Sequence, residues 1–379
     1  MTVTWTTRQA VEGPQVWFAL ANQTRASLND MQVVLASTKV YYSEGDYSLF
    51  NHYATLPGLL PHKRYDYIVG SKNPNTVTST RHTFTTAKGA DADSFAAAVY
   101  GDMGVLKSDH SIAYLNRMDG VDFFWHIGDT SYADDALEHP GTDKNAFMYE
   151  HVYNEFMEKL APAMASRAYM VTVGNHEAEC YSPACLRSTF KKDHLGNFSA
   201  FNTRFHMPSQ DSNGMLNMWY SWTHGPVQFI SVNSEIDFPG AVLDEQTGTH
   251  HNGGFGDQLK WLEQALASAK RQRDMFPWIF VGIHRPLYSV FIENSTYGRL
   301  SHVRKVTRAL QTAFEAFFLE YRVDAVVVGH VHSYERHVPI AHGRAVVDGV
   351  NAAKTGYDNP KAPVYILTGA AGNVEDLTP

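Results

Sequence analysis

Residues 122–132, with the sequence DFFWHIGDTSY, join a run of apolar side chains to a polar turn. The run at 122–127 is typical of a buried strand, because it is short, mostly apolar and followed by glycine. Asp129 and Tyr132 come directly after the carboxyl end of that strand. Both side chains can bind a metal ion through oxygen. The stretch therefore predicts a buried strand that carries candidate metal ligands at its end.

Four further motifs between residues 101 and 332 have the same form, each at or near the end of an apolar run. In an extended segment, residues i and i+2 point the same way, so the two histidines of the last motif can reach one cluster. The four motifs supply Asp102 in GDMG, Asn175 and His176 in GNHE, His284 in VGIH, and His330 and His332 in GHVH.

Taken singly, each motif has an ordinary structural explanation. An aspartate after glycine is usually a turn residue, and a buried histidine is more often a hydrogen-bonded core residue than a ligand. The combination favours metal binding, because five motifs in order supply seven ligands. Two adjacent metal ions can activate water and hold a phosphoryl group. The motifs therefore predict a hydrolase of phosphate esters.

Composition narrows the alternatives. The chain has 379 residues, of which 44% are hydrophobic, as expected for one large or two ordinary globular domains. Its net charge is −8, from 31 basic and 39 acidic residues, and no basic run stands out. A nucleic-acid partner is therefore not expected, because a polyanion requires a basic face. No apolar stretch approaches the length of a membrane-spanning helix, so no membrane span is expected.

The pattern of short runs changes near residue 90. Residues 1–87 predict an all-β sandwich, because short alternating runs at 16–20, 33–35, 39–42, 65–69 and 82–85 are separated by turn residues. Residues 88–93 are small and polar, and are interpreted as a linker. Within the sandwich, residues 60–69 resemble the tyrosine-corner strand of fibronectin type III domains, in which a tyrosine hydroxyl bonds back to the upstream backbone.

Residues 94–379 predict an α/β domain, in which ligands collect at the carboxyl ends of the strands. Residues 301–321 carry an apolar stripe at spacings of three and four, which indicates a core-facing helix rather than a cofactor site. Strands are expected at 95–100, 122–127, 169–173, 227–232, 278–281, 325–328 and 364–367, and helices at 108–118, 145–160, from 257 onward and at 301–321.

The order and content of the five motifs resemble the calcineurin-like metallophosphoesterases, and among them the purple acid phosphatases. Two features decide this. The first motif is Asp-x-Gly at Asp102, where most relatives have Asp-x-His, and the second, Gly-Asp-x-x-Tyr, ends in Tyr132. The resemblance covers nearly the whole chain. It implies the large two-domain type: a fibronectin type III-like β-sandwich followed by a metallophosphoesterase β-sandwich flanked by helices.

The resemblance also implies a ligand set. Fe(III) would be bound beside one divalent ion, which would be zinc, manganese or ferrous iron, and Asp129 would bridge the two. A phenolate stabilises a trivalent ion, which acidifies bound water more than a divalent ion can. His176 would contact phosphate and protonate the leaving oxygen. The ferric site would take Asp102, Asp129, Tyr132 and His332, and the divalent site would take Asp129, Asn175, His284 and His330.

The resemblance implies acid phosphatase activity on small phosphate monoesters. It also implies a location that is secreted or extracellular, or else lysosomal or vacuolar. Homodimers occur in this family. Two other functions stay open. The same metal centre would serve a phosphodiesterase or nucleotide pyrophosphatase, and a secreted binding protein could retain the site as a vestige. The intact set of ligands argues against the vestige.

Several features stay undecided at this stage. Plant members carry further histidines about ten residues past the fourth motif, where this chain has Asn294-Ser295-Thr296. His302 is a candidate replacement or an exposed residue at a helix start. His250 and His251 are interpreted as surface-loop residues, with a substrate-rim role as the alternative.

Cys180 and Cys185 could form a bridge or stay free. Three glycosylation sequons, at Asn22, Asn197 and Asn294, suggest secretion only weakly. The chain begins inside an expected strand and stops soon after residue 375, so trimming at both ends is expected.

Overall fold

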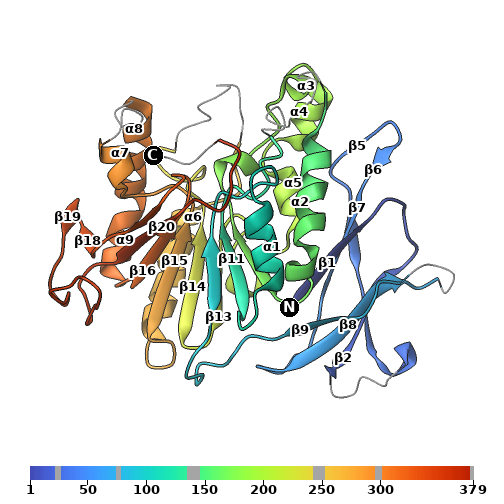
Figure 1. Ribbon diagram of the computed structural model, residues 1–379, viewed down its shortest axis with the longest axis horizontal. Coiled ribbons are helices and arrows are strands. Elements are labelled where there is room, and N and C mark those ends of the chain that lie inside the picture. Colours follow the sequence, from blue (N-terminus) through green and yellow to red (C-terminus); the bar gives the residue numbers. More distant parts are fainter. Residues whose placement is uncertain (22–26, 74–77, 135–145, 242–251, 295–300, 376–379) are drawn as a thin grey trace.

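The computed structural model describes residues 1–21, 27–73, 78–134, 146–241, 252–294 and 301–375, with the backbone alone at 294, 301 and 302. Figure 1 shows an N-terminal group of strands beside a larger body of sheets and helices. Among the described residues, no helix has both the length and the apolar surface that crossing a bilayer requires.

Two antiparallel sheets form the N-terminal sandwich. Residues of β2 alternate between two apolar clusters, with Val16 and Phe18 in the core between the sheets, and Trp17 and Ala19 in a smaller cluster. This is the period of two that a strand imposes on its side chains. One sheet holds β1 (Thr2–Thr7), β7 (Phe50–Thr55) and β4 (Ser37–Lys39), the other β3 (Gln32–Leu35), β2 (Pro14–Leu20), β8 (Arg64–Ser71) and β9 (His82–Thr85); short elements are η2 (Leu28–Asp30), β5 (Ser43–Glu44) and β6 (Tyr47–Ser48).

Tyr65 forms the predicted tyrosine corner, since its hydroxyl accepts a hydrogen bond from the backbone N–H of Leu60 at 3.0 Å. The prediction of a strand at 39–42 is wrong, because β4 ends at Lys39, where the predicted strand should begin. Strand β7 was not predicted, because its buried Asn51 and His52 interrupt the apolar alternation. The ring of His52 is accommodated there by hydrogen bonds to the hydroxyls of two threonines.

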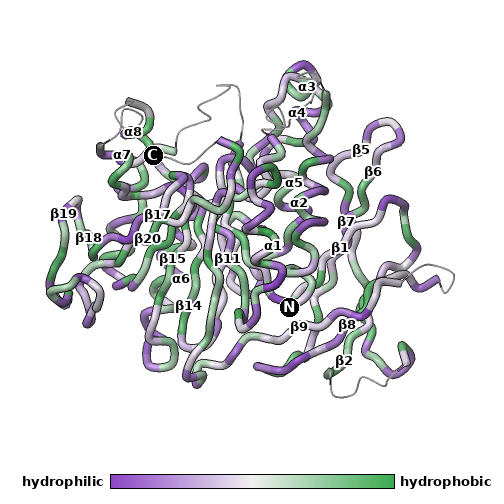
Figure 2. The backbone as a smooth tube through the Cα atoms, in the orientation of Figure 1, coloured by the Kyte–Doolittle hydropathy of each residue, from purple (hydrophilic) through white to green (hydrophobic). Residues whose placement is uncertain are grey.

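The larger domain contains two sheets whose central strands are parallel. Figure 2 shows hydrophobic residues on strands such as β14 and β15, and mostly apolar runs predicted both strands. The first sheet is β10 (Ala97–Tyr100), β11 (Phe123–Ile127) and β12 (Ala168–Thr172). The second, in spatial order, is β13 (Tyr220–His224), β14 (Val227–Val232), β15 (Trp278–Ile283), β16 (Ala325–Val328), β20 (Val364–Thr368) and β17 (Tyr334–Arg336), with β18 (Ile340–Ala341) and β19 (Arg344–Ala345) forming a separate hairpin.

The two sheets pack directly on one another. Trp125 of β11 lies against β15, where a side chain at Gly282 would come within 2.1 Å of the indole ring. The indole N–H of Trp125 donates to the hydroxyl of Thr172, which in turn lies 3.0 Å from the hydroxyl of Ser231 on β14. This close packing places the ends of strands from both sheets at one edge of the molecule.

Helices cover the sheets on both sides (Figure 1). The helix predicted at 145–160 begins and ends four residues later than expected. The helix predicted at 301–321 contains a π-helical turn at 311–315. In that turn the buried carboxylate of Glu315 accepts a hydrogen bond from the hydroxyl of Tyr288. The helices are α1 (Asp109–Arg117), α2 (Tyr149–Met164), α3 (Pro183–Leu186), α4 (Thr189–Leu195), α5 (Ser199–Arg204), α6 (Gln258–Arg271), α7 (Val290–Asn294), α8 (Ser301–Leu310) and α9 (Ala316–Glu320), with 3-10 turns η4 (Asn175–Glu177) and η5 (Gln210–Ser212).

A buried polar network joins the N-terminal strands to the larger domain. Arg204 on α5 donates to Glu150 on α2 at 2.9 Å and to the hydroxyl of Tyr41 at 2.7 Å. Tyr41 and Tyr47, from the N-terminal domain, each donate to the same glutamate. The Arg204 and Glu150 side chains are 1% and 5% exposed, so water stabilises neither charge and each is stabilised mainly by the other.

We expect Arg204→Met to lower the free energy of unfolding by about 3–5 kcal/mol, because it leaves Glu150 buried without its cation. Urea denaturation at neutral pH measures the loss. The matched control is Lys159→Met, which breaks partly exposed ion pairs with Glu155 and Asp109 and should cost about 1 kcal/mol or less. Equal stability of the two variants would contradict the role given to Arg204.

Candidate metal centre

The turns that follow the strands hold their polar residues in an unusual backbone conformation. Four of the predicted ligands have positive φ, a conformation that costs a non-glycine residue of order 1–3 kcal/mol and that clusters at functional sites. They are Asp102 at 61°, Asp129 at 50°, Tyr132 at 51° and His330 at 68°.

The glycines of the motifs are required by the ligands themselves. A Cβ added at Gly128 would lie 2.4 Å from Nδ1 of His284, and one at Gly174 would lie 2.3 Å from Oδ1 of Asp129. Gly128 also has a φ of +76°, which glycine adopts without strain. The motif glycines therefore make room for side chains that come from other strands.

Asp129, His284 and His330 form the tightest group. One ligand atom from each lies within 4.8 Å of the others, and Nε2 of His284 is 2.9 Å from Oδ2 of Asp129. Nδ1 of His284 donates to the carbonyl of Ile127, which turns Nε2 toward the group. Burial opposes charge on His284, but Asp129 raises its pKa to about 10, so a bound metal would have to displace that proton.

Two buried atoms of the predicted ligands, one on Asn175 and one on His284, have no hydrogen-bond partner among the residues that the structure describes. Within the described part of the chain, Oδ1 of Asn175 has no hydrogen-bond partner. Nε2 of His284 has none there either, although it lies 2.9 Å from the Asp129 carboxylate as an ion pair. Each buried polar atom of this kind needs an explanation, and here a bound ion is one that fits. Their types, an amide oxygen and an imidazole nitrogen, fit a metal.

Asp102, Tyr132 and His332 form a second group. The Tyr132 hydroxyl lies 3.3 Å from Oδ1 of Asp102 and 3.2 Å from Nε2 of His332. Burial raises the pKa of Tyr132 well above its ordinary value, and the charges of Asp102 and Asp129 add to the effect. A phenolate at this position would therefore require a cation in direct contact.

His176 borders both groups. Its Nδ1 lies 2.8 Å from Oδ2 of Asp134, and its Nε2 lies 3.9 Å from Oδ2 of Asp129. The His176 ring packs against the Tyr132 ring, with their centroids 4.3 Å apart. A carboxylate at Nδ1 fixes the orientation of an imidazole, so Asp134 aims Nε2 at the candidate ligands. All eight site residues predicted from the sequence thus lie in one connected region.

The same chain segments match known protein families. Residues 97–334 match the calcineurin-like phosphoesterase family, and residues 1–86 match the purple acid phosphatase N-terminal domain. The chain belongs to the purple acid phosphatase family.

Curated relatives carry names of the same family. Acid phosphatase A of Cryphonectria parasitica is 36% identical over 68% of this chain and 53% of its own length. Human acid phosphatase type 7 is 32% identical over 100% of this chain and 76% of its own length. This purple acid phosphatase chain thus spans about half to three quarters of the length of these relatives.

A solved structure supports the fold. The purple acid phosphatase PPD1 from yellow lupin seeds superposes with a TM-score of 0.68 over 98% of this chain and 62% of its own, at 20% sequence identity. At that identity the likeness concerns the fold alone. It agrees with the predicted order of a β-sandwich followed by a metallophosphoesterase domain.

Sequence reasoning missed Glu177, the residue that holds two motifs of this purple acid phosphatase together. Its carboxylate accepts hydrogen bonds from the backbone N–H groups of Asp129, Thr130 and Gly174 at 2.7–2.9 Å. Burial, with the charge of Asp129, raises its pKa to about 7. Asp134 was also missed, although a second aspartate soon after the second motif was a usable signal.

Glu375 is a further acidic neighbour of the site. Its two carboxylate oxygens lie 3.7 Å from Nε2 of His176 and 3.7 Å from Nε2 of His332. It comes from the segment after β20, so its place beside histidines from two other motifs was not evident from the sequence.

The structure describes some of the cysteines, sequons and histidines that the sequence left undecided, and not others. Cys180, in the loop that follows His176, forms a disulfide with Cys185 on α3, five residues later. The sequon residue Asn197 is exposed, and its side-chain amide donates to the carbonyl of Gly253. The sequon at Asn22, the His250-His251 pair, and the side chains of Asn294 and His302 lie outside the described residues.

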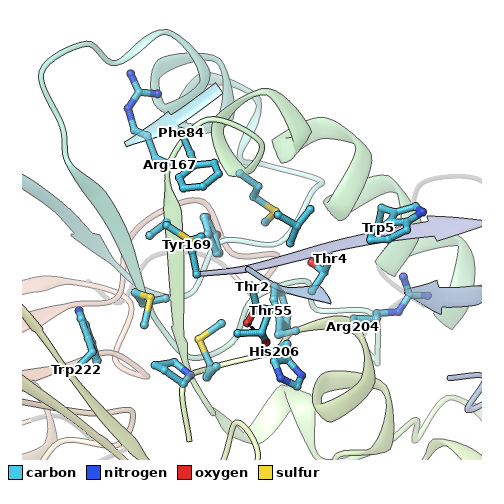
Figure 3. Close-up of a pocket in the computed structure, with 18 of the residues that line it drawn as sticks. Thr2, Thr4, Trp5, Thr55, Phe84, Arg167, Tyr169, Arg204, His206 and Trp222 are labelled. Atoms are coloured by element: carbon cyan, nitrogen blue, oxygen red, sulfur yellow. Dashed lines mark hydrogen bonds between the residues drawn. The ribbon is translucent and has the colours of Figure 1, made fainter. Parts of the chain in front are cut away.

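A large cavity of about 1560 Å³ lies away from the candidate ligands. Figure 3 shows its wall formed by Trp5 and Phe84 of the sandwich and by Tyr169 and Trp222 of the larger domain. Tyr169 lies near the start of β12, whereas the ligands follow the strand ends. None of the eight site residues lines it, so it is a space between the domains rather than part of this centre.

Proposed function

We propose that the chain is an acid phosphatase that hydrolyses small phosphate monoesters at a binuclear metal centre. The observation that carries the proposal is that ligand atoms of Asp129, His284 and His330 lie within 4.8 Å of one another, while Oδ1 of Asn175 and Nε2 of His284 are buried without hydrogen-bond partners among the described residues. The proposed ligands are Asp102, Asp129, Tyr132, Asn175, His284, His330 and His332.

The two groups of ligands support different ions. Fe(III) is proposed for the group of Asp102, Tyr132 and His332, because a buried phenol beside carboxylates gives up its proton only to a strongly charged cation. A divalent ion, zinc, manganese or ferrous iron, is proposed for Asn175, His284 and His330, with Asp129 shared. Such a pair supplies an activated water and neutralises phosphoryl oxygens when bound.

The protein's own residues have separate tasks in this proposal. Asp134 holds the His176 ring with Nε2 toward the ligands, where it can give a proton to the leaving oxygen of the ester. Glu177 fixes the turns that carry Asp129 and Asn175. The strained turns keep the ligands in position before substrate arrives, which reduces reorganisation during the reaction.

A direct test compares the two substrate classes. We expect the metal-loaded protein to hydrolyse 4-nitrophenyl phosphate faster than bis(4-nitrophenyl) phosphate, with higher activity in acid than at neutral pH. A preference for the diester would favour the phosphodiesterase or nucleotide pyrophosphatase alternative. Tight phosphate binding without turnover, with both metals present, would instead support a vestigial site.

We expect Tyr132→Phe to lose the visible charge-transfer band of an iron–phenolate pair and to retain less iron, because the anionic ligand is gone. The visible spectrum and elemental analysis measure both effects. Tyr181→Phe is the matched control, since the Tyr181 hydroxyl lies 3.4 Å from His176 but belongs to neither ligand group. An unchanged band and metal content in Tyr132→Phe would show that the ligand assignment is wrong.

The wider assignments are also proposals. The domain limits are taken as 1–87, 88–93 and 94–379, and the two family matches at 1–86 and 97–334 support them. A secreted, extracellular, lysosomal or vacuolar location is supported by the disulfide, which is typical of oxidising compartments. Glycosylation at exposed Asn197 fits the same location. The homodimer and the absence of nucleic-acid binding stay predictions.

A further inference from the structure

The loop that follows His176 brings a tyrosine to the ring of that histidine. The Tyr181 hydroxyl lies 3.4 Å from Nδ1 of His176, and the two ring centroids are 6.5 Å apart. The same nitrogen lies 2.8 Å from Oδ2 of Asp134. An ionised carboxylate can only accept, so Nδ1 donates to Asp134, and the Tyr181 oxygen is placed to accept a share of the same proton.

Three side chains therefore limit the rotation of the His176 ring. The Tyr132 ring packs on it with the centroids 4.3 Å apart, and Asp134 and Tyr181 both approach Nδ1. Tyr132 and Asp134 belong to the turn after β11, whereas Tyr181 belongs to the same loop as His176 itself. The contact with Tyr181 therefore depends on how firmly that loop is held.

The helices that follow in this loop supply little packing of their own. Figure 1 shows α3 and α4 beyond the ends of the strands. In α3 the one buried residue is Cys185, and in α4 it is Leu195. Segments with few buried apolar contacts open locally at a small fraction of the free energy of global unfolding. A separate constraint is needed to keep Tyr181 against His176.

The disulfide supplies that constraint. Cys180 and Cys185 are both buried, and both belong to the main hydrophobic core of the larger domain. Tyr181 comes directly after Cys180, inside the ring of residues that the disulfide closes. Its other neighbour, Ser182, is also buried, with its hydroxyl 3.6 Å from Sγ of Cys180. Tyr181 is thus tethered on both sides while its hydroxyl points at the histidine.

We propose that Tyr181 is a positioning residue for His176, held against the imidazole by the Cys180–Cys185 disulfide, so that Nε2 stays aimed at the leaving oxygen of the ester. The inference rests on the proposed function, in which His176 protonates that oxygen. Misplacing a catalytic group by about 1 Å can cost on the order of 100-fold in rate. A loosened loop would therefore lower turnover while the ligands and metals stay in place.

The first test compares kcat on two monoesters with different leaving groups, using the metal-loaded protein. In Tyr181→Ala we expect kcat on phenyl phosphate to fall by about 10- to 100-fold, because the ring of His176 loses a contact that orients it. The fall on 4-nitrophenyl phosphate should be smaller, since a good leaving group needs the proton less. Elemental analysis should find both metals retained.

Tyr181→Phe is the conservative variant, because it keeps the ring that fills the loop and removes only the hydroxyl. We expect it to recover part of the rate, with a loss on phenyl phosphate of about 3- to 10-fold, which is the effect of one ordinary hydrogen bond. Equal losses on the two esters in Tyr181→Ala, or no loss at all, would overturn the inference, because Tyr181 would then not act through His176.

The second test removes the constraint. The double variant Cys180→Ala/Cys185→Ala should repeat the pattern of Tyr181→Ala on the two esters, again with both metals retained. The matched control is Ser188→Ala, which removes the N-cap of α4, where the hydroxyl accepts the backbone N–H of Lys191 at 3.2 Å. That variant loosens the same segment away from His176, so it should lower thermal stability and leave the ratio of the two kcat values unchanged.

Two results of the second test would count against the proposal. An unchanged ratio in the double cysteine variant would show that the disulfide does not hold Tyr181 in place. A shift of the ratio in Ser188→Ala as large as in the double variant would assign the effect to general loosening of the segment. If the double variant does not fold, the two Tyr181 variants keep the disulfide and still decide whether Tyr181 positions His176.

Failure of the proposed function gives a different result. If the unmodified protein hydrolyses neither ester, the proposed activity is wrong, and titration calorimetry with inorganic phosphate tests Tyr181 instead, because His176 is also expected to contact phosphate. Weaker phosphate binding by Tyr181→Ala than by Tyr181→Phe would then support the inference, and equal binding would overturn it. If both esters are hydrolysed normally by Tyr181→Ala, the activity stands and the inference alone is wrong.

Discussion

Asp129→Asn is expected to lose both metals and to reduce monoester hydrolysis by about 10³-fold or more, because the two ions together supply several kcal/mol of transition-state stabilisation. Asp129 is the one proposed ligand shared by both groups. Its Oδ2 lies 2.9 Å from Nε2 of His284, while its charge also acts on Tyr132. An amide keeps the shape of the carboxylate but removes the charge that a bridge requires.

The measurement is metal content by elemental analysis after exhaustive dialysis, with activity recorded in parallel. Asn175→Ala should lose mainly the divalent ion, because Asn175 belongs to one group. Asp134→Asn is the matched control, since it makes the same change in a buried aspartate that contacts His176 rather than a ligand. Equal metal retention in Asp129→Asn and Asn175→Ala would count against a bridging role.

His176→Ala is expected to keep both metals and to lower kcat by roughly 10²–10⁴-fold, the usual contribution of a general acid. The Nε2 atom faces the site while Nδ1 is held by Asp134, so the ring is oriented to deliver a proton. A poor leaving group depends on that proton more than a good one does. The loss should therefore be larger for phenyl phosphate than for 4-nitrophenyl phosphate.

Steady-state kinetics on the two esters give the comparison directly. His194→Ala serves as the control, because His194 is exposed on α4 and its ring bonds to the carbonyl of Phe190. That variant should retain normal kcat on both esters. If His176→Ala loses the same factor on both, His176 binds phosphate without protonating the leaving oxygen.

The strands that carry the ligands could be predicted because their signal is local. Buried parallel strands such as β11, β15 and β16 are mostly apolar runs, and a polar motif marks where each one ends. Strand β7 lacked that signal, since its buried His52 is held by the hydroxyls of Thr7 and Thr38, which are distant in sequence. Edge strand β17 is short and mostly exposed, so its pattern was equally weak.

The residues around the ligands were harder to predict. Glu177 and Asp134 act on groups more than 40 residues away in sequence, so their roles depend on how the turns meet. Arg285 was visible in the sequence only as part of a family resemblance. Its orientation follows from Glu235, 50 residues earlier and at the end of a neighbouring strand.

The sequence by itself determined which strands are buried, which ligand types follow them, and that glycine precedes several ligands. These properties depend on near neighbours in the chain, through side-chain periodicity and backbone sterics. Only the tertiary structure decided that Cys180 pairs with Cys185, that His176 is held by Asp134, and that Arg285 faces His330. The last two contacts join turns that are distant in sequence, and their geometry is set by the packing of the two sheets rather than by any local pattern.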